Sequence, residues 1–205
     1  MNPHTRARTL LLACTLTLAL PMVLSLSACT TTSPQVIDSP ASQLNEANEL
    51  AKQAQAKDRE GKLDEAISIY QQAVRVAPTY APGWHNMGVL LMRRGNNLDA
   101  ATAFQVAAEN DLTDPRPYTA MGMLAQELLH YDEAAKYYTK ALERSDRYLP
   151  ALRKSIEVDQ LRDKYDDTTL QRIRRAVYLE TDPQWKTYLL NQKIKAEQRI
   201  SRSAG

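Results

Sequence analysis

Apolar residues recur at helical spacing between residues 45 and 148, with polar residues between them. In the middle of this stretch Trp84, Met87, Gly88 and Leu91 occupy positions i, i+3, i+4 and i+7, which places them on one face of a helix. The chain shows no alternation of apolar and polar residues of the kind typical of β-strands. The pattern therefore predicts a series of amphipathic helices and an all-α fold.

The helical pattern returns with a period of about 34 residues, a length that indicates repeated helix–turn–helix units. It is clearest in three segments, GKLDEAISIYQQAV from Gly61, GNNLDAATAFQVAA from Gly95 and LLHYDEAAKYYTKA from Leu128. The residues that recur at this spacing are Ala66, Ala100 and Ala134; Tyr70, Phe104 and Tyr138; Ala73, Ala107 and Ala141; Trp84 and Tyr118; and Gly88 and Gly122.

This period, with these residue types, resembles the tetratricopeptide repeat family. The resemblance covers residues 47–80, 81–114 and 115–148. It implies that each unit has a helix A, a short turn and a helix B, and that the units stack into a solenoid with a concave groove. Gly88 would let helix B approach closely, and Phe104 would fill the space between the two helices.

A few positions depart from the family pattern. The first unit has Leu50, Ala54 and Lys57 where a large aromatic residue, Gly and Tyr are usual, and the third has Leu129 in place of a Gly. These departures lie within the tolerance of the family, so the fold expectation is unchanged.

The period fades after residue 148, but helical patterns continue to about residue 200. The segments LPALRKSIEVDQLRDKY and TTLQRIRRAVYLET predict two helices, and a third is expected from about Gln184 to Ile200. We interpret residues 149–205 as a degenerate fourth unit, a capping helix and a short tail, because solenoids need a capped end. The last helix should carry Trp185, Tyr188, Leu189, Ala196 and Ile200 along one face.

Residues 1–28 differ from the rest. They contain Arg6 and Arg8, no acid, and an apolar run from Leu10 to Leu20, which is the plan of a secretory signal peptide. A transmembrane anchor is the alternative, because the apolar stretch to Ala28 approaches spanning length. Residues 29–44 are rich in Ser, Thr and Pro and are expected to form a flexible tether.

The sequence Leu26-Ser27-Ala28-Cys29 resembles the lipobox of bacterial lipoproteins. The resemblance implies cleavage after Ala28, lipidation of Cys29 and anchoring by several acyl chains, palmitate among them. Thr30 follows in place of the Asp that retains enterobacterial lipoproteins in the inner membrane, which favours the outer membrane, facing the periplasm. The covalent lipid is the only cofactor that we expect.

The charge and the cysteine content argue against nucleic-acid binding and against a thiolate metal site. Without Arg6 and Arg8 the chain has 24 basic and 24 acidic side chains, so no basic excess points to nucleic acid. No cysteine follows Cys29, which excludes a disulfide or thiolate metal site in the repeats. The charge is unevenly distributed, with −4 over residues 29–148 and +4 over residues 149–205.

Candidate catalytic groups have simpler explanations. The acids at Asp64-Glu65, Asp99 and Asp132-Glu133 recur in the first turn of helix B, where they complement the helix dipole. His85 and His130 are far apart in sequence and form no recognisable zinc motif or catalytic triad. A phosphate-binding loop is also missing from the sequence. The protein is therefore expected to bind, not to catalyse, and to hold no metal.

The resemblance to the family implies that the A helices line the groove. Some tetratricopeptide repeat proteins hold a peptide carboxylate with a Lys/Asn/Asn/Lys/Arg set, and the matching residues here are Ala51, Gln55, Asn86, Arg116 and Ala120. Only two of these fit, so a mixed polar and apolar groove for an extended segment or a helix is expected. The alternative is that these are solvated helix positions. The candidate groove residues are Asn48, Gln55, His85, Asn86, Val89, Arg93, Arg116, Thr119 and Met123.

Two functions are compatible with these observations. The first is a lipid-anchored periplasmic scaffold that binds another envelope protein or peptide, similar in architecture to pilus-assembly and cell-wall adaptor lipoproteins. The second is a structural module that self-assembles, which a capping helix packed on its own chain through Trp185 would oppose. The basic segment RIRRAVYLE could contact anionic lipid or could be a solvated helix face.

Overall fold

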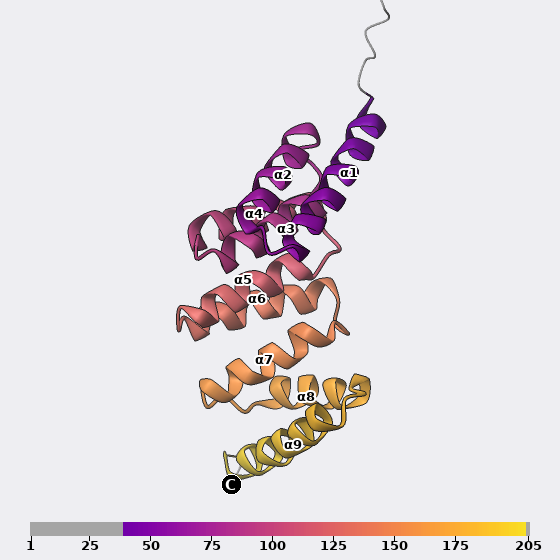
Figure 1. Cartoon of the computed structure of the whole chain (residues 1–205). Helices are drawn as coiled ribbons and strands as arrows, with labels where there is room; N and C mark the ends of the chain where they lie inside the picture. Colours follow the sequence, from indigo (N-terminus) through magenta and orange to yellow (C-terminus); the bar gives the residue numbers. More distant parts are fainter. Residues whose placement is uncertain (1–38, 204–205) are drawn as a thin grey trace, which may run out of the picture. The chain divides into compact units, whose positions relative to one another are not determined.

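The computed structural model describes residues 39–203, so the predicted signal peptide, Cys29 and most of the predicted tether lie outside the described residues. The described part contains nine helices and no strand (Figure 1). None of these helices is both long enough and apolar enough to span a membrane. The segment Asp38–Gly205 forms one compact unit. The helices are α1 (Pro40–Arg59), α2 (Leu63–Val76), α3 (Ala81–Arg93), α4 (Asn97–Asn110), α5 (Arg116–Glu127), α6 (Tyr131–Arg144), α7 (Leu149–Leu161), α8 (Asp167–Leu179) and α9 (Pro183–Ser203).

The helices pack in antiparallel pairs that follow chain order. The pairs α1–α2, α3–α4, α5–α6 and α7–α8 form four units, and α9 packs on α8. The backbone of helix A in each unit also approaches helix A of the next, from α1 to α7, whereas the backbones of neighbouring B helices stay farther apart within the described residues. The surface formed by α1, α3, α5 and α7, here called the helix-A face, is therefore the tighter side of the stack.

The same turn joins helix A to helix B in all four units. Gly61, Gly95, Leu129 and Asp163 recur at the repeat spacing, and each has a positive φ, at 76°, 86°, 62° and 48°. Left-handed backbone at this point closes a Schellman motif, in which the next N–H reaches the carbonyl five residues back. These bonds are Lys62 N to Lys57 O at 2.9 Å, Asn96 N to Leu91 O at 2.9 Å, His130 N to Ala125 O at 2.9 Å and Lys164 N to Asp159 O at 2.8 Å.

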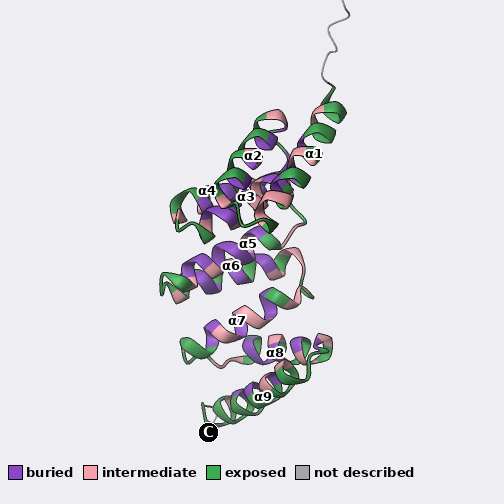
Figure 2. Ribbon diagram, in the orientation of Figure 1, coloured by how far each residue is buried: buried purple, intermediate pink, exposed green. Residues whose placement is uncertain are grey.

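The expected contact between a helix-A glycine and a helix-B aromatic ring is confirmed. A Cβ on Gly88 would lie 2.6 Å from Cε1 of Phe104, and one on Gly122 would lie 2.5 Å from Cε1 of Tyr138. The first unit has Ala54 at this position, fully buried, so its helices accommodate one extra methyl group. Buried residues line the facing sides of each pair (Figure 2). The repeated alanines Ala66, Ala73, Ala100, Ala107, Ala134 and Ala141 are all 0% exposed.

The degenerate fourth unit is a shifted copy of the third. Its left-handed turn residue, Asp163, keeps the repeat register, but the buried residues of its second helix come one position late. One extra residue between Asp163 and α8 therefore hides the period in the sequence. The shifted equivalents of Ala134, Ala135, Tyr138 and Ala141 are the buried residues Thr169, Leu170, Ile173 and Ala176.

Two expected boundaries are corrected. The tether was predicted to run to residue 44, but α1 begins at Pro40. Ser39 caps the helix, because its Oγ accepts a hydrogen bond from the Ser42 backbone N–H at 3.1 Å, and a proline suits the first helical position. The last helix, α9, extends from Pro183 to Ser203. Along the predicted face Leu189 and Ala196 are 0% exposed, whereas Trp185, Tyr188 and Ile200 are only partly buried.

Candidate partner-binding groove

All nine predicted groove residues lie on A helices. Asn48 and Gln55 are on α1, while Arg116, Thr119 and Met123 are on α5. The helix between them, α3, contributes the other four, which are His85, Asn86, Val89 and Arg93.

Two of the predicted polar residues converge on one tyrosine. Tyr70 projects from α2, and its side chain is only 2% exposed. Burial raises the pKa of Tyr70, and the nearby side chains of Gln55 and Asn86 partly offset that rise. Amide groups from two successive A helices therefore meet at the same point of the helix-A face.

The two predicted arginines are already paired with acids. Arg93 Nη1 lies 2.6 Å from Asp58 Oδ1, so this pair joins α3 to the end of α1. Arg116 contacts both carboxylate oxygens of Asp114, with Nη2 at 2.8 Å from Oδ2. Each pair leaves donors of the guanidinium group at the surface, but neither arginine adds a free charge to the groove.

His85 lies between the groove and the core. Its ring is 5.7 Å from that of Phe104, and its Nδ1 is buried without a hydrogen-bond partner among the described residues. Burial lowers the pKa of His85 to about 4, with a further lowering by Arg116 and a small opposing effect of Asp114. The imidazole is therefore neutral at pH 7.

One predicted groove residue is wrong. Thr119 is only 5% exposed, and its hydroxyl donates to the Pro115 carbonyl at 2.9 Å, so it has no group free for a partner. The family alignment placed it on the concave side, but neighbouring helices cover that side of α5. Val89 and Met123 are half-buried against the core and supply the apolar part of the groove.

The residues at the carboxylate-clamp positions do not form such a clamp. Ala51 and Ala120 are buried, with 2% and 6% of their surface exposed, and neither carries a base. The helix-A face therefore offers neutral hydrogen-bonding groups beside Tyr70, and paired charges on either side.

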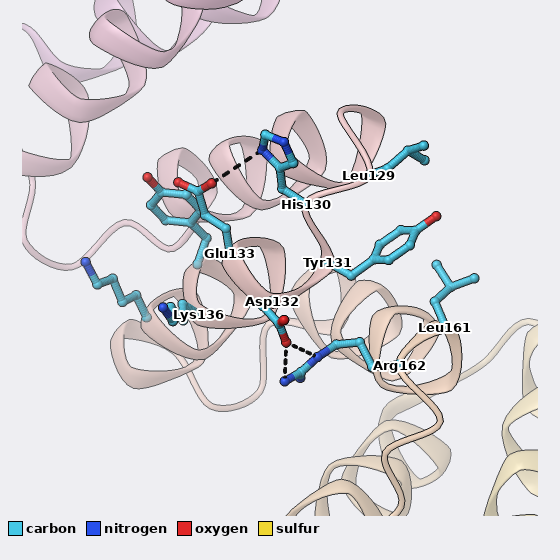
Figure 3. Close-up of a pocket in the computed structure, with 10 residues that line it drawn as sticks. Leu129, His130, Tyr131, Asp132, Glu133, Lys136, Leu161 and Arg162 are labelled. Carbon is cyan, nitrogen blue, oxygen red and sulfur yellow. Dashed lines mark hydrogen bonds and ion pairs between the residues drawn. The ribbon is translucent and has the colours of Figure 1, made fainter.

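A hollow at the turn edge was not predicted from the sequence. Its volume is about 610 Å³, and Leu129, Tyr131 and Leu161 line it, next to an ion pair between Asp132 and Arg162 at 2.8 Å (Figure 3). Across the same turn, His130 Nδ1 lies 3.7 Å from Glu133. The sequence signal that could have revealed it is Leu129 itself, an apolar residue at the turn position where units one and two have glycine.

The basic segment of α8 is engaged within the chain. Arg172 lies 2.9 Å from Asp159, Arg174 lies 3.4 Å from Glu197, and Arg175 lies 3.3 Å from Asp146. These pairs favour a structural role for the segment over lipid contact. Residues 39–203 contain no cluster of His, Cys, Asp and Glu able to hold a metal ion.

Comparison with known proteins bears on the fold. A family model described as tetratricopeptide repeat matches residues 50–80 and 115–148, which include part of α1 and the whole of α2, α5 and α6. The fold is a tetratricopeptide repeat (TPR) solenoid. The second TPR unit, 81–114, and the shifted fourth unit lie outside the matched ranges and are recognised by their helix pairs and turns.

Solved TPR structures resemble the chain at low sequence identity. The first TPR of Spaghetti (RPAP3), bound to the HSP90 peptide SRMEEVD, has 21% identity and a TM-score of 0.55, covering 59% of this chain and 96% of that one. A structure of MamA has 16% identity and a TM-score of 0.55, with coverages of 74% and 96%. The Sgt2 TPR domain from Aspergillus fumigatus has 19% identity and a TM-score of 0.54, with coverages of 58% and 80%. A search of curated protein sequences finds no match.

Proposed function

We propose that the protein is a lipid-anchored scaffold of the bacterial envelope that binds a segment of another envelope protein on its helix-A face. The observation that carries this proposal is the proximity of Gln55 and Asn86 to Tyr70, because there two successive A helices present neutral amide groups beside the same residue. Neutral amide groups suit the backbone of an extended peptide, and Val89 and Met123 supply apolar contacts for its side chains.

The expected ligand is an internal segment, not a chain terminus. The related TPR of Spaghetti is described with a bound peptide, SRMEEVD. In this chain Ala51 and Ala120 are buried, and the arginines Arg93 and Arg116 are paired with acids, so little free positive charge remains for a terminal carboxylate. Binding of this kind should depend weakly on salt.

The proposed location rests on the lipobox. Lipidation of Cys29 would hold the protein on the periplasmic side of the outer membrane, and Thr30 to Ser39 would join the lipid to α1. Ten extended residues span at most about 35 Å, so the groove would stay close to the membrane surface. Assembly of a pilus, secretion or cell-wall complex is the setting in which such a scaffold would act.

Crosslinking in cells tests the partner. The intact protein is compared with a groove variant in which His85, Asn86, Arg93 and Arg116 are changed to Ala. The matched control carries Ala at four exposed helix-B residues, Gln71, Gln72, Gln105 and Glu109. A stoichiometric envelope partner that is lost only in the groove variant supports the proposal. A partner that persists in the groove variant and disappears in the control moves the interface to the other face.

The lipid anchor is tested separately. Cys29→Ser should move the protein from the membrane fraction to the soluble periplasm, and metabolic labelling with palmitate should disappear. Cys14→Ser serves as the control because it lies within the predicted signal peptide. Retention of Cys29→Ser in the membrane with an uncleaved N-terminus would instead support the transmembrane alternative.

A further inference from the structure

An ion pair links neighbouring units at the turn edge, and it recurs with the repeat. Arg94, directly after α3, lies 2.9 Å from Asp64 in the first turn of α2. Arg162, directly after α7, lies 2.8 Å from Asp132 in the first turn of α6. The two pairs are separated by two repeat periods. Each connects helix B of one unit to the turn of the next.

Between units two and three, apolar residues occupy the two positions where the other interfaces have an ion pair. The equivalent residues between units two and three are Leu98 in α4 and Leu128 after α5, which are 81% and 47% exposed. They line a cleft of about 310 Å³ together with Met121, Leu124 and Tyr137. We call this hollow the Leu98 cleft. Among the described residues that line it, Glu133 is the only acid or base of fixed charge.

An apolar stripe of matching character lies on α9. Leu190 and Ile194 are 42% and 54% exposed, although they belong to a helix whose other side is buried on the chain. Lys186 precedes Leu190 at the same i, i+4 spacing, so the three residues share one stripe. The outer face of a solenoid cap is usually polar, which makes exposed Leu and Ile there unusual. We call Lys186, Leu190 and Ile194 the α9 stripe.

The two surfaces have complementary charge. Asp99 and Glu127 are the sequence neighbours of Leu98 and Leu128, and neither has a Lys or Arg within ion-pair distance in residues 39–203. Lys186 likewise has no acid within that distance among the described residues. The segment that bears the stripe belongs to the +4 part of the chain, residues 149–205, and the cleft belongs to the −4 part. A contact between the cleft and the stripe would therefore be apolar at its centre, with opposite charges at its edge.

We propose that the Leu98 cleft of one copy receives the α9 stripe of a second copy. Leu190 and Ile194 would enter the cleft, and Lys186 would face Glu133. Because each chain carries both surfaces, two such contacts related by a two-fold axis would close a dimer. End-to-end stacking is a different mode, and it is opposed by Trp185, which packs 4.5 Å from the Arg153 guanidinium and edge-on to Tyr188.

Analytical ultracentrifugation of the chain from Thr30 onward tests the pairing, since residues 38–205 form a compact unit with its own core. The wild type should show a concentration-dependent monomer–dimer equilibrium. The double variant Leu98→Asp/Leu128→Arg restores the ion pair of the other two interfaces, so it should fold normally and dissociate at least tenfold more readily. Leu112→Asp is the matched control, since this leucine is 67% exposed and lies outside the cleft.

Charge reversal tests the orientation of the contact. Glu133→Lys should weaken the dimer several-fold, and so should Lys186→Glu. The combined variant Glu133→Lys/Lys186→Glu should recover the affinity, because the two charges face each other again. Two losses that simply add would contradict the proposed contact between Glu133 and Lys186.

The proposal is overturned by a monomer at all concentrations up to about 1 mM, or by equal weakening in Leu98→Asp/Leu128→Arg and Leu112→Asp. A photo-crosslinker at position 98 of the intact protein in cells gives a second readout. A product of twice the chain mass, joined to a peptide from α9, supports it, and a crosslink to a different protein overturns it. The groove variant should leave the dimer intact, so failure of one proposal is distinguishable from failure of the other.

Discussion

In units two and three a glycine on helix A lets helix B pack closely, whereas in unit four large apolar side chains and buried charged groups lie between the two helices. Gly88 and Gly122 admit the rings of Phe104 and Tyr138. At the corresponding positions, unit four has Ile156 and Ile173, which are 2% and 0% exposed. The TPR turn is kept in both cases, so the turn, and not the residues between the helices, is the constant part of the unit.

Unit four also buries charges that the other units lack. Asp159 is 1% exposed, accepts a hydrogen bond from Thr169 at 2.9 Å and contacts Arg172 at 2.9 Å. Burial raises the pKa of Asp159, and Arg172 and Thr169 oppose that rise. Because Thr169 and Arg172 lie beyond the extra residue, these bonds fix the shifted register of α8. The comparison shows that a degenerate unit can replace shape complementarity with directional bonds.

Breaking the buried pair should give the largest effect. Arg172→Met leaves Asp159 without its shortest ion pair and should lower the free energy of unfolding by about 4 kcal/mol. Asp159→Asn/Arg172→Met removes both charges and should recover most of that loss, as measured by urea denaturation. If the double variant is as unstable as the single one, the pair contributes more than charge compensation.

Adding a side-chain atom between the helices should destabilise unit two, whereas removing side-chain volume should destabilise unit four. Gly88→Ala adds a methyl group 2.6 Å from Phe104 and should cost about 2 kcal/mol. Ile156→Ala removes buried volume and should cost about 3 kcal/mol. Thermal unfolding followed by circular dichroism gives both values. If Gly88→Ala leaves the stability unchanged, the two helices of unit two can move as far apart as those of unit one, where Ala54 is already present.

The pair Arg153–Glu180 gives a test that depends on pH. Burial favours a higher pKa for Glu180, but the hydrogen bonds from Arg153 and from the N–H groups of Thr181 and Asp182 outweigh it, so the pKa lies below its usual value. A lowered carboxyl pKa stabilises the fold above the unfolded value, near 4.5, and this stabilisation is lost as pH falls through the folded value. Glu180→Gln should therefore cost about 2 kcal/mol at pH 7 and progressively less below pH 4.5. A constant cost across this range would show that the carboxylate charge is not involved.

The smallest expected effect is an increase in stability at the turn between α5 and α6. Leu129 occupies the left-handed turn position with φ of 62°, where units one and two have glycine. Leu129→Gly should stabilise the protein by about 1 kcal/mol, and Gly95→Ala should destabilise it by a similar amount. Equal unfolding midpoints for Leu129→Gly and wild type would imply that the Leu129 side chain makes compensating contacts in the turn-edge hollow.

The sequence predicted the three regular units well, because Ala, Gly and aromatic residues recur there at one fixed spacing. Unit four was harder, since a single inserted residue before Thr169 breaks the spacing although the turn at Asp163 keeps it. The groove was predicted as a set of surface positions, but the pairing of Arg93 with Asp58 and the burial of Thr119 depend on neighbouring helices. The Leu98 cleft becomes visible only when the residues at the unit interfaces are compared in space.

The contacts between helices have a consequence for the speed and order of folding. Helices touch only their first and second neighbours along the chain within residues 39–203. Contacts so close in sequence require little loop closure, so folding should be fast and should be able to begin in any adjacent pair of helices. Because α1 and α9 have neighbours on one side only, their amide protons should exchange first, and protection should rise toward the central helices.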